Sequence, residues 1–113
     1  MCDDLSACLA EATGLVHATP VGMGAPAMPL PPQLLRPDLW VADAVYFPLE
    51  TELLKAARSV GCATVDGGTM VVGQALGAFE LFTGLKADAA RMTSHFGSLL
   101  EQTRQFKQLK QLD

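Results

Sequence analysis

The sequence predicts one α/β domain, in which a short parallel sheet of about three strands is flanked by helices in three layers and followed by a long C-terminal helix. Three observations predict this fold. Short apolar stretches alternate with segments of helical pattern, and the joints between them are short. The strand candidates are apolar almost throughout, as in a parallel sheet that is covered on both faces. The length, residues 1–113, is that of a single domain.

The first part of the chain predicts a helix, a strand and a loop. Leu5–Ala12 is rich in apolar residues and follows Asp3 and Asp4, either of which can cap the start of a helix. Leu15–Thr19 is a short apolar stretch typical of a buried strand. Six prolines between positions 20 and 37 exclude a regular helix, so residues 22–37 are expected to form a loop.

The middle of the chain predicts a second strand, a helix and a third strand. Leu39–Tyr46 is apolar almost throughout, and Pro48 ends it. Thr51–Val60 has the pattern of a helix whose first threonine is the N-cap and whose C-terminus is closed by the glycine that follows. Cys62–Val65 is the third strand, and it is short.

Two further helices are expected in the last part of the chain. Thr69–Phe82 is apolar on nearly all sides, which predicts a buried helix. Ala87–Leu112 has the length of a long final helix. Its inward stripe is expected to consist of Met92, His95, Phe96, Leu99, Leu100, Phe106 and Leu109.

Charge and composition exclude several classes of function. The net charge of −4 and the lack of a basic cluster argue against nucleic-acid binding. No apolar stretch approaches the length of a membrane span, and the acidic N-terminus does not look like a secretory signal, so a cytoplasmic location is expected. The three cysteines, Cys2, Cys8 and Cys62, are an odd number without paired spacing and are expected to be reduced thiols.

A resemblance to a known family covers most of the chain. Four segments resemble, in the same order and at similar spacing, segments of the shikimate and quinate dehydrogenases. They are residues 15–23 (LVHATPVGM), 42–54 (ADAVYFPLETELL), 66–75 (DGGTMVVGQA) and 79–84 (FELFTG). The resemblance implies the second half of a Rossmann-like, NADP-binding domain.

The resemblance also implies roles for particular residues. Tyr46 and Gln74 match residues that face the substrate across a cleft between two domains. Thr19, Ala44 and Gly67 match positions at the nicotinamide end of NADP. This arrangement agrees with the rule that ligands of open α/β sheets bind beyond the carboxyl ends of the strands.

Departures from the family pattern predict that the chain is a truncated member without activity of its own. His17 stands where the family has asparagine, and Ala44 stands where it has a larger apolar residue. No Gly-x-Gly-x-x-Gly segment opens a helix, because prolines follow Gly22-Met23-Gly24. The family's catalytic lysine and aspartate belong to segments without a counterpart here. We therefore expect no catalytic residue in the chain, and weak or no NADP binding.

Two other hypotheses remain open at this point. The chain can be a self-associating interaction or accessory protein, or it can be the C-terminal half of a split dehydrogenase with a separate N-terminal partner. A homodimer or higher homo-oligomer is expected for the chain by itself, because Leu15–Thr19 would be an open sheet edge without its usual neighbour. Cys2, Cys8 and His17 could in principle approach a metal ion, but their spacing fits no known zinc motif and no metal site is predicted.

Overall fold

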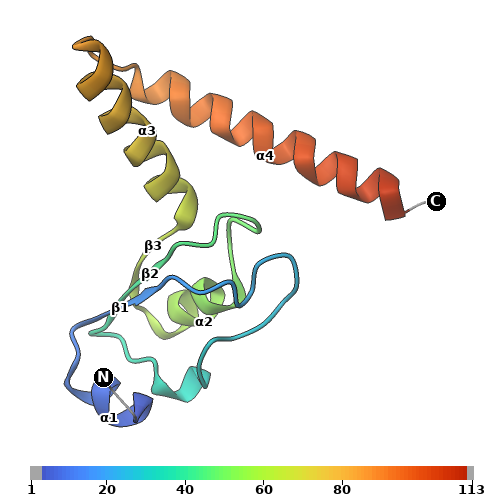
Figure 1. The fold of residues 1–113 in the computed structure, drawn as a ribbon. Coiled ribbons are helices and arrows are strands. Elements are labelled where there is room, and N and C mark those ends of the chain that lie inside the picture. Colours follow the sequence, from blue (N-terminus) through green and yellow to red (C-terminus); the bar gives the residue numbers. More distant parts are fainter. Residues whose placement is uncertain (1–3, 112–113) are drawn as a thin grey trace. The chain divides into compact units, whose positions relative to one another are not determined.

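The computed structural model describes residues 4–111, and the chain divides into two compact units, Met1–Met70 and Val71–Asp113. The helix α3 (Gly67–Thr83) begins in the first unit and continues into the second, which also contains α4 (Ala89–Gln111). The first unit holds α1 (Leu5–Glu11), β1 (Gly14–His17), the 3-10 turn η1 (Pro32–Leu34), β2 (Trp40–Asp43), α2 (Glu52–Val60) and β3 (Ala63–Val65) (Figure 1). The organisation as one domain stays a prediction.

The sheet has three parallel strands, as predicted, and their order is β1-β2-β3. The middle strand is shorter than expected, because β2 ends at Asp43 and not at Tyr46. The Asp43 carboxylate accepts the Val45 N–H at 3.0 Å, and this local turn takes the chain out of the sheet. In the same way β1 ends at His17 and not at Thr19, whose hydroxyl accepts the N–H of Val21.

The core of the first unit lies between one face of the sheet, α1, α2 and the proline-rich loop. As predicted, α2 starts at the Thr51 N-cap, buries Leu53, Leu54 and Ala57, and ends at Gly61, whose φ of 101° is left-handed. The buried apolar residues of this core are Leu9, Leu30, Leu35, Leu39, Val41, Leu53, Leu54, Ala57 and Cys62. The loop between β1 and β2 therefore contributes directly to the core.

Asp43 is the polar centre of the first unit and is fully buried. One carboxylate oxygen accepts from the Val45 N–H and contacts Nδ1 of His17, both at 3.0 Å. The other oxygen accepts the Thr51 hydroxyl at 2.7 Å, and that hydroxyl in turn accepts the Leu54 N–H at the start of α2. One side chain thus joins the ends of β1 and β2 to the N-terminus of α2.

Gly67 brings the turn after β3 against the segment that leaves β2. A Cβ at this position would lie 2.5 Å from the carbonyl oxygen of Ala44 and 2.4 Å from that of Val45. No side chain fits such a distance from backbone atoms, so this approach requires glycine. Asp66, the residue before it, caps the new helix by accepting the Thr69 N–H at 2.7 Å.

The second face of the sheet is open within the first unit. Val16 is 60% exposed, and Trp40 and Val65 are also exposed. The indole of Trp40 lies over Gly14, where a Cβ would overlap its ring atoms. The helical cover of the sheet in this unit, chiefly α2, therefore lies on one face, and the other face presents apolar side chains.

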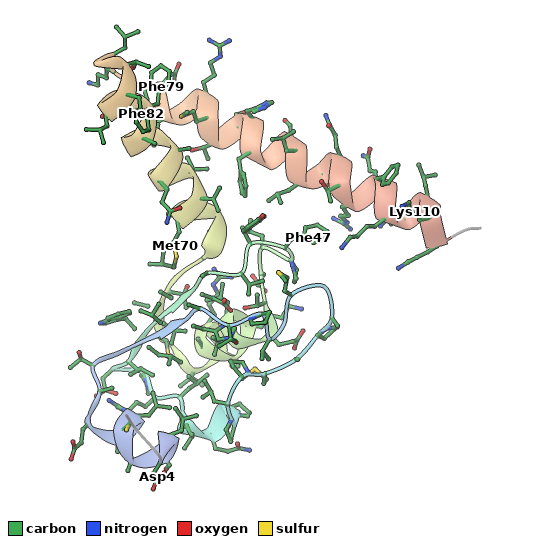
Figure 2. The ribbon with its side chains drawn as sticks, in the orientation of Figure 1. Asp4, Phe47, Met70, Phe79, Phe82 and Lys110 are labelled. Atoms are coloured by element: carbon green, nitrogen blue, oxygen red, sulfur yellow. The ribbon has the colours of Figure 1, made fainter. Side chains whose placement is uncertain are left out.

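The two helices of the second unit are less buried than predicted. Thr69–Phe82 was expected to be a buried helix, but in the described chain its later turns are exposed, and Phe82 is 86% exposed (Figure 2). The described residues of α4 include none that is buried, so its inward stripe is not formed either. The physical reason is that an apolar helix face is buried only where another element packs on it, and these 113 residues supply too few. Leu112 lies outside the described residues.

The cysteines differ from the expectation of three reduced thiols. Cys8 takes part in a disulfide, whereas Cys62 is free and buried. Burial raises the pKa of the Cys62 thiol, and its Sγ donates to the carbonyl oxygen of Arg36 at 3.1 Å. Cys62 is therefore a packing residue of the core.

Replacing Asp43 by asparagine is expected to destabilise the first unit by about 1–3 kcal/mol. The amide has one acceptor oxygen where the carboxylate has two, so one buried donor among His17, Val45 and Thr51 loses its partner. Urea denaturation followed by the fluorescence of Trp40, the single tryptophan, measures the change. As control, D38N alters an exposed carboxylate that forms an ion pair with Arg36 and should cost less than about 1 kcal/mol. Equal losses in both variants would contradict the central role of Asp43.

Replacing Gly67 by alanine is expected to cost about 2 kcal/mol or more, since the new methyl group must displace backbone atoms. Gly73→Ala is the matched control in the same helix. Nothing lies within 4 Å of the Cβ it would add, so it should stabilise the helix by about 0.5–1 kcal/mol. Denaturation curves that rank the two variants in the opposite order would refute the close approach at Gly67.

Candidate functional site

The candidate site lies at the carboxyl end of the sheet, where β1, β2 and β3 each lead into a turn. The Ala44 N–H donates to the carbonyl oxygen of His17 at 2.9 Å, which holds the start of the turn after β2 against the end of β1. Gly67 packs on the carbonyl groups of Ala44 and Val45. The structure thus brings together two of the three predicted cofactor residues, Ala44 and Gly67. This is the edge at which ligands of parallel sheets bind.

Thr19, the third predicted cofactor residue, is exposed and is joined to the same cluster through His17. The Thr19 hydroxyl contacts Nε2 of His17, whose Nδ1 contacts the Asp43 carboxylate. His17 is buried, and it is the register partner of Asp43 at the end of the two strands. The result is a continuous hydrogen-bonded path from a buried carboxylate through an imidazole to an exposed hydroxyl.

No functional role is predicted from the sequence for either His17 or Asp43. A signal was present, because a histidine and an aspartate each interrupt an otherwise apolar strand candidate. Only the pairing register of β1 with β2 places the two residues opposite one another. That register depends on three-dimensional strand pairing and cannot be read from the spacing of the two residues.

The two predicted substrate residues lie in different units. Tyr46 follows β2 in the first unit and is 47% exposed. Gln74 lies on α3 in the second unit and is also exposed. Each is therefore accessible on its own unit, and their meeting across one cleft stays a prediction.

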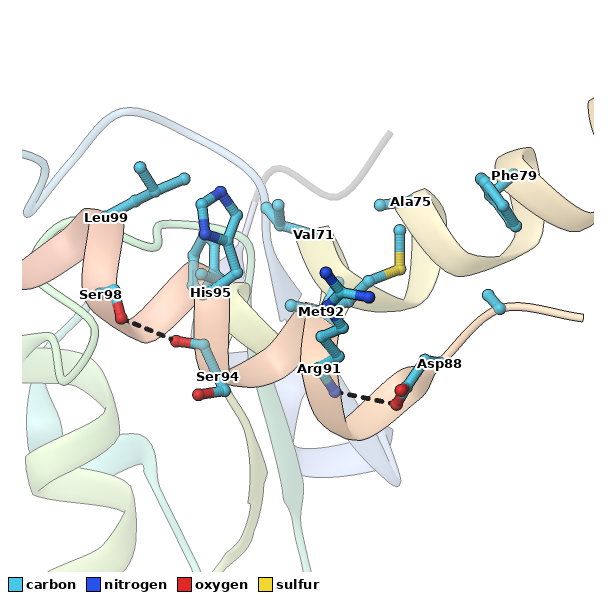
Figure 3. Close-up of a pocket in the computed structure, with 13 residues that line it drawn as sticks. Val71, Ala75, Phe79, Asp88, Arg91, Met92, Ser94, His95, Ser98 and Leu99 are labelled. Atoms are coloured by element: carbon cyan, nitrogen blue, oxygen red, sulfur yellow. Dashed lines mark hydrogen bonds between the residues drawn. The ribbon is translucent and has the colours of Figure 1, made fainter.

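A separate groove lies in the second unit, between α3 and α4 (Figure 3). It encloses about 840 Å³ and is mostly apolar, with Val71 and Phe79 on one side and Met92 on the other. Two of its polar side chains are engaged locally: the Asp88 carboxylate caps α4 by accepting the Arg91 N–H, and the Ser98 hydroxyl donates to the carbonyl of Ser94. No predicted site residue lines this groove.

The described part of the chain offers no set of residues for a metal ion. Among residues 4–111, no three His, Cys, Asp or Glu side chains gather in a way that could hold one. His17 is already engaged by Asp43 and Thr19. Cys8 takes part in a disulfide, and Cys2 lies outside the described residues. None of the described helices combines the length and the apolar character needed to cross a membrane.

Comparison with known proteins gives the same family by sequence and by structure, although no family model matches the chain. It is 57% identical over 98 residues to the shikimate dehydrogenase (NADP(+)) of Streptomyces avermitilis, and the match covers 86% of this chain and 34% of that enzyme. The quinate dehydrogenase of Corynebacterium glutamicum, solved in complex with NAD, superimposes with a TM-score of 0.79 at 50% identity, over 83% of this chain and 34% of that one.

A third relative is the shikimate 5-dehydrogenase of Thermus thermophilus, solved with NADP(H) and shikimate. It matches with a TM-score of 0.72 at 38% identity, over 78% of this chain and 34% of that one. The chain thus spans about one third of the length of the relatives that it matches. By sequence and by fold, it belongs to the shikimate and quinate dehydrogenase family.

Proposed function

We propose that this chain supplies the part of a shikimate or quinate dehydrogenase that lines the nicotinamide end of the cofactor site and one side of the substrate cleft. The observation that carries the proposal is the cluster at the carboxyl end of the sheet. Thr19, Ala44 and Gly67 lie there, each shortly after the end of one of three neighbouring strands. Relatives that are 50% and 38% identical to the chain are described in complex with NAD, and with NADP(H) and shikimate.

The residues at this cluster fit the nicotinamide end of a dinucleotide and not its phosphates. Thr19 offers an exposed hydroxyl, and the small, exposed Ala44 leaves room beside it. No Gly-x-Gly-x-x-Gly segment opens a helix to receive a pyrophosphate. When bound, the cofactor would supply the hydride acceptor; the chain's own contribution is to position the ring and to hold the substrate through Tyr46 and Gln74.

Turnover is proposed to require the remaining two thirds of the enzyme. The resemblance assigns proton transfer to a lysine and an aspartate in segments that have no counterpart in these 113 residues, and hydride transfer needs such a group within hydrogen-bond reach. An isolated chain would therefore hold part of the cleft without the acid–base pair. The split-enzyme hypothesis is the form of this proposal in which a separate N-terminal chain supplies the rest.

A chimera tests the proposal directly. Residues of this chain replace the matching 98 residues of the Streptomyces avermitilis enzyme, and shikimate oxidation with NADP⁺ is measured. The chimera should be active, whereas the isolated chain should show no rate above background. Gln74→Ala in the chimera should lower kcat/KM by about tenfold, as expected for one lost polar contact to the substrate.

Gln102→Ala is the matched control for the chimera, because Gln102 is an exposed glutamine on α4 without a proposed role. It should leave kcat/KM unchanged. Oxidation of shikimate by the isolated chain, abolished by Gln74→Ala, would overturn the requirement for the missing part. A folded but inactive chimera would overturn the proposed function itself.

A second candidate function, self-association, is favoured by the open edge of β1. Within the described residues β1 pairs only with β2. The carbonyl groups of Thr13 and His17 accept hydrogen bonds from β2 or the residue that follows it, so by alternation the N–H and C=O groups of Gly14 and Val16 point away from the sheet. We propose that a second copy pairs its own β1 along this edge, since a two-fold axis makes the edge complementary to itself.

Val16→Pro removes the outward N–H at this edge and leaves the bonds to β2 in place, because proline is tolerated where the N–H faces solvent. Light scattering of the wild-type chain should give twice the 12.0 kDa monomer mass, and V16P should give the monomer. Val16→Thr keeps both the N–H and the branched side chain and should remain a dimer. A wild-type monomer at micromolar concentration, or a V16P dimer, would refute pairing through β1.

A further inference from the structure

The hydroxyl of Thr19 has a fixed hydrogen-bonding polarity that follows from the groups behind it. These groups begin at the buried Asp43 carboxylate. Thr51 accepts the Leu54 N–H, so its one hydroxyl proton is available for the contact to Asp43, where it is donated to the carboxylate. The other carboxylate oxygen accepts the Val45 N–H. Both oxygens of Asp43 therefore act as acceptors, as in an ionised carboxylate.

The contact between His17 and Asp43 then fixes the imidazole tautomer. Since the Asp43 oxygen is an acceptor, Nδ1 of His17 must carry the proton and donate it across 3.0 Å. Three donors thereby meet the two oxygens of the carboxylate. In the neutral ring Nε2 is an acceptor.

His17 in turn fixes the direction of the hydrogen bond at Thr19. Nε2 of His17 contacts the Thr19 hydroxyl, which already accepts the Val21 N–H at 3.3 Å. The hydroxyl proton of Thr19 is directed to Nε2, and one lone pair on its oxygen is used by Val21. One lone pair remains, and Thr19 is exposed at the ligand end of the sheet.

We propose that the Asp43–His17 pair fixes the Thr19 hydroxyl as a hydrogen-bond acceptor toward the crevice, so that this strand end selects a ligand group that donates an N–H. His17 acts as a positioning residue and Thr19 as the specificity-determining one. The choice of ligand rests on the proposed function. The carboxamide of a nicotinamide ring offers such an N–H, whereas a carboxylate in its place has only lone pairs, which repel the remaining lone pair of the Thr19 hydroxyl oxygen.

The first arm of the test measures the tautomer and needs no ligand. Long-range ¹H–¹⁵N correlation spectra of the labelled chain at neutral pH should show His17 with a proton on Nδ1 and none on Nε2. His95, which is exposed on α4, serves as the internal reference for an unrestrained ring. A proton on Nε2 of His17 would overturn the proposal, because the Thr19 hydroxyl would then be a donor.

The second arm compares two dinucleotides that differ in one group, NADP⁺ and its analogue with a carboxylate in place of the carboxamide. Binding is followed through the backbone amide signals of Thr19 and Ala44, with NADP⁺ expected in the millimolar range and the analogue about tenfold weaker. Thr19→Val, which keeps the shape and removes the oxygen, should abolish the difference, and Thr19→Ser should retain it.

Equal binding of the two dinucleotides by the wild-type chain would overturn the specificity assigned to Thr19. Binding of neither would overturn the ligand assignment, while the activity of the chimera still decides the proposed function and the tautomer measurement still decides the polarity of Thr19. Retention of the Nδ1–H tautomer in Thr19→Val would support the assignment of Asp43 as the group that orients His17.

Discussion

The buried carboxylate of Asp43 is the constraint on which the first unit depends. A charged group with no exposure is tolerated in a core only when its oxygens are matched by donors. Here the donors come from three directions: the end of β1 through His17, the turn after β2 through Val45, and the N-cap of α2 through Thr51. Two strand ends and one helix start are thereby held at fixed relative positions.

The same constraint shapes the candidate site. By accepting the Val45 N–H, Asp43 ends β2 early and turns the chain so that Ala44 and Val45 meet Gly67 from the next turn. By orienting His17, it determines which way the hydroxyl of Thr19 is polarised. A group that stabilises the fold from the inside therefore also determines the hydrogen-bonding character of the exposed edge, where ligands of parallel sheets bind.

The two units differ in how much of their apolar surface they bury. The first unit forms a core from α1, α2, the loop and one face of the sheet, but it leaves the β1 edge and the second sheet face open. In the second unit α3 and α4 leave large side chains such as Phe82 and Phe106 exposed. Exposed apolar surface of this extent normally marks a contact surface. The chain spans about one third of the length of the relatives that it matches, and within its described residues these surfaces are left uncovered.

The sequence by itself determined the order and type of the elements, because these depend on local signals. The cap at Thr51, the glycine at position 61 and the proline-rich loop act within a few residues of chain, and the family resemblance rests on short segments. The C-terminal ends of the strands were predicted less accurately, because the side chains of Asp43 and Thr19 compete with the sheet for backbone N–H groups.

Only the tertiary structure decided which surfaces are buried and which polar groups meet. The apolar pattern of residues 69–82 predicts burial, but burial requires a packing partner, and the pattern does not say whether one is present. Likewise the pairing of His17 with Asp43 depends on strand register, which is set by contacts between residues 26 positions apart. Propensity and capping are properties of neighbouring residues, whereas register and cover are properties of the assembled fold.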